Sequence, residues 1–315
     1  MTHFTQEEDK MKQIKLPSTN KKDELQIYIW EPADKPKAIV QLSHGMVEHL
    51  SRYDGFATYL SGRGFLVIGN DHLGHGLTAK EEDLGYFGEG KSKTVVDDLY
   101  SVTEYAKKTY GDDIPYFLFG HSMGSFMARR YIMTYGSALT GAVICGTGRQ
   151  PAAVLASGRC LTSIIGLFKG ERHKPDILDT IAFGAYNKRI ENPISKSAWL
   201  TKDDEIVKAY DKDKFCTFKF TVNGYKTLFE SIAFIQKQSN INNIPKDLPL
   251  FLIAGAEDPV GEYGEGVKIV YNSYKEAGIK DLEIKLYEGD RHEVLNELDK
   301  EDVYKDVAEW LEKRM

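Results

Sequence analysis

The stretch Phe117-Leu118-Phe119-Gly120-His121-Ser122-Met123-Gly124-Ser125 predicts the centre of the fold. It is apolar as far as Gly120, and an amphipathic segment of helical spacing follows at residues 126–133 and ends at Gly136. This order predicts a strand, a tight turn and a helix. The glycines two residues either side of Ser122 let the helix approach the strand, in a strained turn that projects the hydroxyl. Ser122 is therefore a candidate nucleophile.

Alternating strand and helix patterns flank this turn on both sides. The first strand, residues 25–30, alternates apolar and polar side chains, which predicts a half-exposed edge strand. The alternation as a whole predicts the α/β class, with a mostly parallel central sheet and helices on both faces. Strands are predicted at residues 25–30, 38–43, 65–69, 117–119, 139–145, 248–255 and 282–287, and helices at 53–60, 95–110, 126–133, 264–277 and 301–313.

The alternation stops between residues 146 and 223, where no strand pattern occurs. This region contains many aromatic side chains and short helical pieces at residues 161–168, 177–183 and 205–210. We interpret it as a helical cap inserted into the sheet domain. The predicted organisation is a core in two parts, residues 1–147 and 225–315, with the cap at residues 148–224.

The composition is typical of a soluble globular protein. The 315 residues are 42% hydrophobic, and the net charge of −6 argues against nucleic acid as a partner, since its binding requires a basic face. The amino terminus lacks a basic region followed by an apolar one, and no run of ~20 apolar residues occurs, so neither a signal peptide nor a membrane span is expected. We expect a cytoplasmic protein.

The three cysteines, Cys145, Cys160 and Cys216, are widely spaced and form no C-x-x-C motif. This spacing favours reduced thiols, although a disulfide between two of them stays open. Cys145 lies within an apolar run, which favours a buried strand residue over a nucleophile.

A serine nucleophile requires a base and an orienting acid, which in an open α/β sheet lie just after strands. Asp258 and His292 meet this requirement, because each follows a late predicted strand and both come after Ser122 in the chain. Glu257 is a rival acid, and Asp290 is a weaker one.

The oxyanion that forms during attack on an ester requires two backbone N–H donors. The residue after the nucleophile, Met123, supplies one of them. The other is expected from the loop after the strand that delivers His44 and Gly45, where the position indicates Met46.

The pattern Asp71-His72-x-x-His75 raises the question of a metal site. Zinc requires three or four converging ligands, and the sequence offers no second cluster to complete the set. We therefore expect neither a metal nor a cofactor, and we interpret Asp71 as hydrogen-bonded within its own turn.

Together these motifs resemble the α/β-hydrolase superfamily, and within it they are most similar to the monoacylglycerol lipase and lysophospholipase branch, grouped with serine aminopeptidase S33-like hydrolases. The resemblance covers residues 20–147 and 225–315. It rests on the stretches around Asp258 and His292 and on His44-Gly45-Met46-Val47-Glu48-His49, Asp71-His72-Leu73-Gly74-His75-Gly76 and Gly120-His121-Ser122-Met123-Gly124.

The resemblance implies a serine esterase of lipid metabolism with an α/β-hydrolase fold and a cap over its active site. It implies a catalytic triad of Ser122 as nucleophile, Asp258 as acid and His292 as base. It further implies that the amides of Met46 and Met123 form the oxyanion hole. The expected substrate is a small lipid ester, cleaved through an acyl-enzyme intermediate without a cofactor.

Two questions stay open at this point. The same triad serves peptidases and thioesterases, and some members of such folds bind ligands without catalysis. The apolar cap residues Leu161, Ile164, Ile165, Leu167 and Phe168 would suit a channel for one acyl chain, transient contact with a membrane surface, or packing within the cap.

Overall fold

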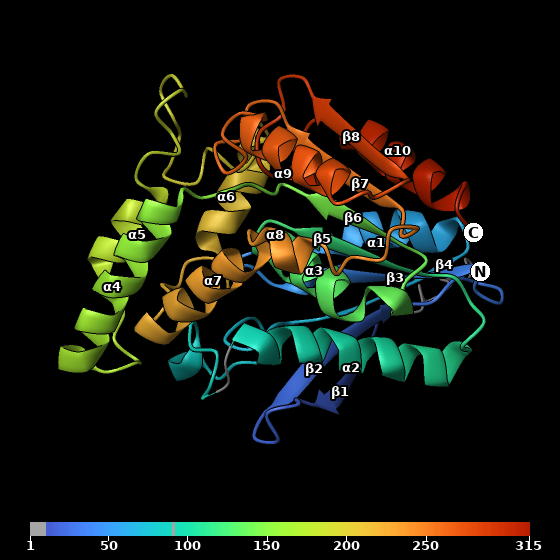
Figure 1. The fold of residues 1–315 in the computed structure, drawn as a ribbon, viewed down its shortest axis with the longest axis horizontal. Coiled ribbons are helices and arrows are strands. Elements are labelled where there is room, and N and C mark those ends of the chain that lie inside the picture. The colour runs from blue at the N-terminus through green and yellow to red at the C-terminus, as the bar shows by residue number, and fades with distance from the viewer. Residues whose placement is uncertain (1–10, 90–91) are drawn as a thin grey trace, which may run out of the picture.

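The computed structural model describes residues 11–89 and 92–315, which are built around one sheet (Figure 1). Its eight strands lie in the order β1-β2-β4-β3-β5-β6-β7-β8. All pairs from β4 across to β8 are parallel, whereas β2 is antiparallel to both β1 and β4. The predicted α/β class is confirmed. The strands are β1 (Met11–Pro17), β2 (Glu24–Trp30), β3 (Ala38–Ser43), β4 (Phe65–Asn70), β5 (Tyr116–His121), β6 (Gly141–Cys145), β7 (Leu250–Gly255) and β8 (Leu282–Tyr287).

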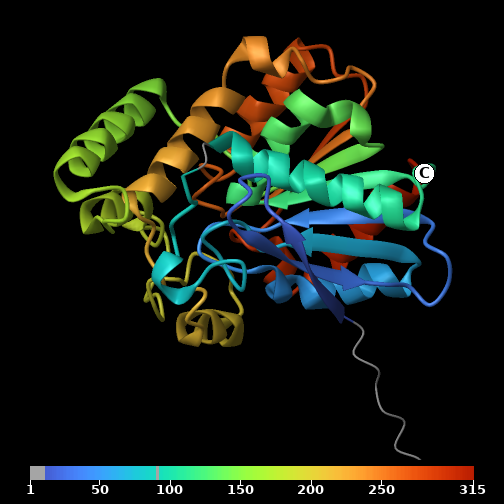
Figure 2. The same cartoon turned by 90° about the horizontal axis from the view of Figure 1, so that it is seen from below.

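Helices cover both faces of the sheet (Figure 2). α1 (Asp54–Gly62) and α10 (Lys300–Glu312) pack on one face. α2 (Ser92–Tyr110), α3 (Met123–Tyr135) and α9 (Glu265–Glu276) pack on the other. Because both faces are covered, β3 to β7 are buried throughout and their sequences are apolar runs. Four short 3₁₀ helices join these elements: η1 (Leu50–Tyr53), η2 (Glu81–Asp83), η3 (Gly136–Ala138) and η4 (Val294–Asn296).

The prediction that residues 25–30 form a half-exposed edge strand is wrong. β2 lies between β1 and β4, and all of it after Glu24 is buried. Successive side chains of β2 point to opposite faces of the sheet, and helices cover both faces. Ile27 and Ile29 therefore pack in one core, and Tyr28 and Trp30 pack in the other. The edge position belongs to β1, which the sequence analysis missed because its alternate residues are polar and exposed.

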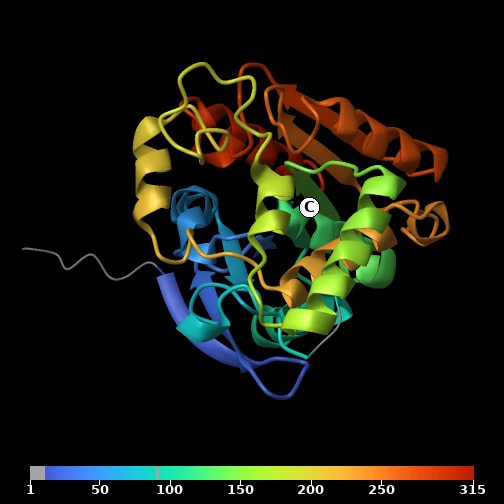
Figure 3. The same cartoon turned by 90° about the vertical axis from the view of Figure 1, so that its left-hand side faces the viewer.

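The interrupted region is helical, as predicted. It projects from one end of the sheet in Figure 1, and in Figure 3 this end faces the viewer. The first cap helix begins earlier than the predicted piece at residues 161–168. α7 (Val222–Ile235) packs against α2, α3 and α4 (Ala152–Lys169), so it bridges cap and core across the predicted boundary at residue 224. The domain boundaries themselves stay a prediction. The helices are α4 (Ala152–Lys169), α5 (Asp176–Phe183), α6 (Asp204–Lys212), α7 (Val222–Ile235) and α8 (Gln238–Ile241).

α4 is exposed along most of its length. By length and composition alone it is apolar enough to cross a membrane, although no run of about 20 apolar residues occurs. Leu155 and Thr162 are its buried residues, while the Leu167 and Phe168 side chains are 81% and 80% exposed. Part of the apolar cap surface therefore does not pack within the protein.

The three cysteines are free, so the disulfide left open by the sequence does not form. Cys145 is buried in β6, which confirms its interpretation as a core strand residue.

Candidate active site

Ser122 occupies the turn between β5 and α3. Its backbone is left-handed, with φ 53° and ψ −122°, which is strained for a residue that carries a Cβ. Two glycines allow this turn: a Cβ on Gly120 would lie 2.5 Å from the Gly124 carbonyl oxygen, and a Cβ on Gly124 would collide with Ser43. Ser122 is partly exposed, whereas its two chain neighbours are buried.

The structure brings Asp258 and His292 together from the loops that follow β7 and β8. His292 Nδ1 lies 2.9 Å from Asp258 Oδ1, and both side chains are buried. Of the rival acids, Glu257 is exposed and Asp290 lies beside Asp299. Burial and the Asp299 carboxylate raise the pKa of Asp290 to about 7. Asp258 is therefore the candidate acid that contacts the imidazole.

The imidazole of His292 contacts two aromatic rings. The His121 ring lies 4.8 Å from it and the Trp199 ring 4.9 Å, measured between ring centroids. Within the described residues, the Nδ1 contact with Asp258 lacks hydrogen-bond alignment, and Nε2 has no hydrogen-bond partner, so no bond to Ser122 Oγ is formed. Such bonds are often long or misaligned in a free enzyme and tighten when substrate binds.

The two predicted oxyanion donors flank the serine. Met123 is the first residue of α3, so its amide is one of the unpaired donors at a helix amino terminus. Met46 follows Gly45, which lies against the serine: a Cβ on Gly45 would be 3.0 Å from the Cβ of Ser122. Neither amide donates to a backbone carbonyl among the described residues.

A buried charge network lies behind these groups. Arg52 donates two hydrogen bonds of 2.7 Å to the Glu293 carboxylate and a third of 2.7 Å to Glu48. Glu48 accepts in turn from the Gly45 amide and from the Tyr53 hydroxyl. One carboxylate thus contacts the predicted oxyanion loop, and the arginine ties it to Glu293, the residue after His292.

His121, the residue before Ser122, belongs to the same network. Its Nδ1 lies 3.3 Å from Glu48 Oε1, and its Nε2 lies 3.2 Å from the His292 carbonyl oxygen. Burial alone would lower the pKa of His121, but Glu48 and Glu293 raise it above the ordinary value. A charged His121 can donate to both acceptors, which connects the serine turn to the histidine loop.

The sequence analysis missed this network. Glu48 was identified only as part of a motif, and neither Arg52 nor Glu293 was singled out. A signal was present, because Glu48 and Arg52 are four residues apart at the start of a helical segment, a spacing at which opposite charges meet.

The histidines at the ends of β3 and β4 support the oxyanion loop. His44 Nε2 accepts from the His72 amide at 2.9 Å, and Nδ1 lies 2.8 Å from the Gly45 carbonyl oxygen. Burial lowers the pKa of His72 to about 3 and that of His75 to about 4, so both are neutral near pH 7. These contacts favour a structural role for the motif.

Asp71 does more than the sequence predicts. Its carboxylate accepts from Leu77 at 2.7 Å, within its own turn, but also from Leu50 at 2.8 Å and from Tyr28 at 3.0 Å. The residue therefore joins three separate segments beneath the site.

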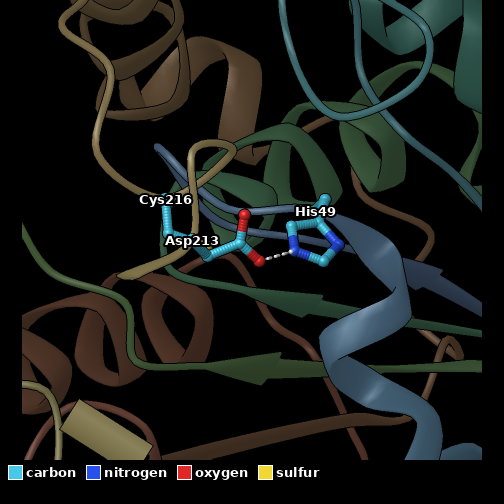
Figure 4. Close-up of side chains that lie close together, drawn as sticks. All are labelled: His49, Asp213 and Cys216. Carbon is cyan, nitrogen blue, oxygen red and sulfur yellow. Dashed lines mark hydrogen bonds and ion pairs between the residues drawn. The ribbon is translucent and has the colours of Figure 1, made fainter. Parts of the chain in front are cut away.

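Another cluster of metal-ligating groups lies where the cap meets the core (Figure 4). His49 Nε2 is 2.9 Å from Asp213 Oδ2, and the ligand atoms of His49, Asp213 and Cys216 all lie within 4.8 Å of one another. The imidazole also bonds through Nδ1 to Ser51 at 2.8 Å, and Asp213 accepts from the Phe215 amide at 2.8 Å. These bonds account for the histidine and the carboxylate without an ion. The absence of a metal stays a prediction.

The chain is similar to known proteins over most of its length. Residues 34–299 match the family model described as serine aminopeptidase, S33. Among solved structures, a highly thermostable carboxyl esterase from Bacillus coagulans, in complex with glycerol, is 30% identical and has a TM-score of 0.90. That match covers 96% of this chain and 98% of the esterase.

Two relatives found by sequence are matched over different shares of their own length. Monoglyceride lipase from Mus musculus is 26% identical over 290 residues, which cover 91% of this chain and 86% of the lipase. An uncharacterized abhydrolase domain-containing protein from Dictyostelium discoideum is 24% identical across 94% of this chain, but the match spans only 28% of that protein.

Proposed function

We propose that this chain, which belongs to the serine aminopeptidase S33 family of α/β-hydrolases, cleaves carboxylic esters of small lipids through an acyl-enzyme intermediate. The broader activity, hydrolysis of carboxylic esters, follows from the family match and from the similarity to a carboxyl esterase and a monoglyceride lipase. One observation supports the proposed acyl-enzyme mechanism. Asp258 and His292 form a buried pair at the carboxyl ends of the strands, the same edge of the sheet at which the Ser122 turn lies.

In the proposed reaction, Ser122 Oγ attacks the ester carbonyl carbon while His292 Nε2 removes its proton. Asp258 orients the imidazole and stabilises the imidazolium that forms. The imidazolium then protonates the leaving alcohol, which leaves the acyl group on the serine. Water, deprotonated by His292, attacks the acyl-enzyme and releases the fatty acid.

The amides of Met46 and Met123 are the proposed donors to the oxyanion. Two preorganised amides would stabilise the negative charge of the transition state more strongly here than in water, since that charge develops in a site partly closed to solvent. The strained left-handed turn at Ser122 supports this role, because it directs the hydroxyl away from the strand and leaves the Met123 amide at the helix end.

A monoacylglycerol or a lysophospholipid is the proposed substrate. The aromatic rings of Phe183, Tyr186 and Trp199 form a continuous cluster that reaches His292. Such a wall suits an apolar acyl chain near the reacting carbonyl, with the polar head group left toward solvent.

The test is a panel of glycerol esters with acyl chains from acetyl to lauroyl, assayed beside the matching amide and thioester. We expect kcat/KM to rise by at least about tenfold along the ester series, since each buried methylene contributes roughly 0.8 kcal/mol of transfer free energy. Equal rates for acetyl and lauroyl esters would refute the acyl channel. Faster cleavage of the amide or thioester would instead identify a peptidase or thioesterase.

We also propose that the cap touches the lipid surface that presents the substrate. Most of its exposed apolar side chains lie on two successive helices, α4 and α5, and an apolar helix face of this kind is typical of an interfacial helix. They are Val154, Ile164, Leu167 and Phe168 of α4 and Ile177 and Ile181 of α5.

The double variant Leu167→Glu, Phe168→Glu should lower the fraction that co-sediments with phosphatidylcholine vesicles by about tenfold or more, because it places two charges in the apolar contact. Hydrolysis of a soluble acetyl ester should be unchanged. Ile269→Glu, at an exposed apolar residue of α9, is the matched control and should bind vesicles as the natural protein does. Equal co-sedimentation of all three proteins would rule out contact through the cap.

A further inference from the structure

A cavity of about 290 Å³ lies where the cap meets the loop that carries Asp258. Tyr186 and Arg189 line it from the chain after α5, and Glu257 and Tyr263 line it from the loop between β7 and α9. Arg291, the residue before His292, completes the charged part of its wall. The cavity thus adjoins both members of the candidate acid–base pair, yet neither of them lines it.

The two arginines in this wall have no carboxylate partner within 4 Å among residues 11–89 and 92–315. Arg189 is exposed, and its guanidinium stacks on the Tyr263 ring, 3.4 Å from the ring centroid. Arg291 donates from Nη1 to the carbonyl oxygens of Ala198 at 2.8 Å and Thr201 at 3.1 Å. Its Nε is buried and makes no hydrogen bond within those residues, so one face of this guanidinium lacks an acceptor.

The acidic groups nearby do not neutralise the arginines. The Glu257 side chain is exposed and pairs with neither arginine in the described chain. Asp258 is buried, and its Oδ1 accepts from the Val260 amide at 2.8 Å and contacts His292. Two arginines therefore line a cavity whose wall contains one carboxylate, that of the exposed Glu257.

The backbone fixes Tyr263 in this wall. Glu262, Tyr263 and Gly264 are consecutive left-handed residues, with φ of 51°, 58° and 89°. A side chain at the first two positions is strained, so the packed loop must hold them there. This loop conformation places the Tyr263 ring under the Arg189 guanidinium.

We propose that this cavity binds a phosphate-class oxyanion between Arg189 and Arg291. A guanidinium presents parallel N–H donors that match two oxygens of a phosphate, and stacking on an aromatic ring leaves its edge free to donate. Two sources share this chemistry: free phosphate, and the phosphate of an acylglycerol head group. The second source rests on the proposed function and would make phosphorylated acylglycerols substrates.

The cavity is placed to hold such a head group near the reacting bond. The rings of Tyr186 and Trp199 are 4.7 Å apart, and Trp199 lies 4.9 Å from His292, measured between centroids. Two ring contacts therefore link the cavity wall to the candidate base. Figure 1 shows the chain after α5 reaching toward the loop that precedes α9.

The first experiment titrates inorganic phosphate into the full chain by calorimetry. The natural protein should bind it saturably, and Arg189→Gln should raise the Kd by about tenfold or more, because it removes one charged fork of hydrogen bonds. Lys188→Gln removes the same charge from the adjacent exposed residue and should leave the Kd unchanged. No binding by the natural protein, or the same Kd in Arg189→Gln, would overturn the free-phosphate arm.

The second experiment compares kcat/KM for 1-oleoylglycerol and for 1-oleoylglycerol 3-phosphate. A head-group site predicts that the ratio of the phosphorylated to the neutral substrate falls about tenfold in Arg189→Gln but not in Lys188→Gln. Phosphate binding with an unmoved ratio would identify free phosphate as the ligand. No phosphate binding together with an unmoved ratio would refute the site. If neither ester is cleaved, the proposed function fails while the titration still decides the anion site.

Discussion

Replacing Ser122 with alanine is expected to lower kcat for ester hydrolysis by ~10⁴-fold or more, because the change removes the proposed nucleophile. The fold should be retained. Ser122 Oγ makes no hydrogen bond among the described residues, and its main-chain bonds, from its amide to Cys145 and from Ser125 to its carbonyl oxygen, do not involve the side chain. The loss should therefore appear in steady-state kinetics with an unchanged thermal unfolding curve.

Ser125→Ala is the matched control, since it deletes another hydroxyl one helical turn away. The Ser125 hydroxyl donates to the Ser122 carbonyl oxygen at 2.6 Å, so we expect a loss of less than about tenfold, typical of one neutral hydrogen bond. Turnover by Ser122→Ala within tenfold of the natural protein would end the assignment of Ser122 as nucleophile.

Arg52→Ala is expected to lower the free energy of unfolding at pH 7 by roughly 3–5 kcal/mol. The Arg52 side chain is 12% exposed and sits between two carboxylates that are each 4% exposed. Its removal leaves the Glu293 carboxylate buried without an ion-pair partner and leaves Glu48 with His121 alone, which is costlier than losing a surface pair. Because domains are stable by only about 5–15 kcal/mol, chemical denaturation should register the loss clearly.

Arg63→Ala is the control that separates the loss of a buried ion pair from the loss of an arginine at the surface. Arg63 also pairs with a glutamate, Glu312, at 3.0 Å, but its side chain is 38% exposed. A pair screened by solvent contributes about 0–1 kcal/mol, so this variant should lose no more than that. Equal losses in the two variants would show that the buried network does not support the fold.

The pH dependence of the Arg52→Ala deficit follows from the two carboxyls. Burial alone would raise the pKa of both carboxyls. The His121 hydrogen bond and the Arg52 charge hold the pKa of Glu48 well below its ordinary value, and Arg52 lowers the pKa of Glu293. Such groups stabilise the fold above their unfolded pKa of about 4.3, and this stability is lost as the pH falls through the folded pKa. The deficit should therefore be full at pH 7 and shrink below about pH 4.

The residues that carry the proposed chemistry could be predicted from the sequence because each has a local signal. Ser122 lies between glycines whose role is steric, and the close approach of α3 to the strands confirms that reasoning. Asp258 and His292 follow short apolar runs, and strands so recognised end at one edge of a parallel sheet. The rival acids could be set aside only once the distance from His292 to Asp258 was known.

The supporting groups could be predicted only in part: the four-residue spacing of Glu48 and Arg52 is a local signal, but the other contacts of the network join distant segments. Nothing in the sequence indicates that Arg52 meets Glu293, 241 positions away. The burial of β2 was missed for a related reason. An alternating pattern indicates an exposed face only if no other element covers that face, and here α1 and α10 cover the second face of β2. The cavity with Arg189 and Arg291 likewise arises from segments distant in the chain.

The most direct test of the account is the reaction of the full chain with a fluorophosphonate probe, followed by digestion and mass spectrometry. Such a probe forms a covalent bond only with an activated serine. We predict one adduct, on the peptide that contains Ser122, with ester hydrolysis lost in proportion to labelling. An unlabelled Ser122 in a chain that still hydrolyses esters, or an adduct on another serine that abolishes hydrolysis, would contradict it.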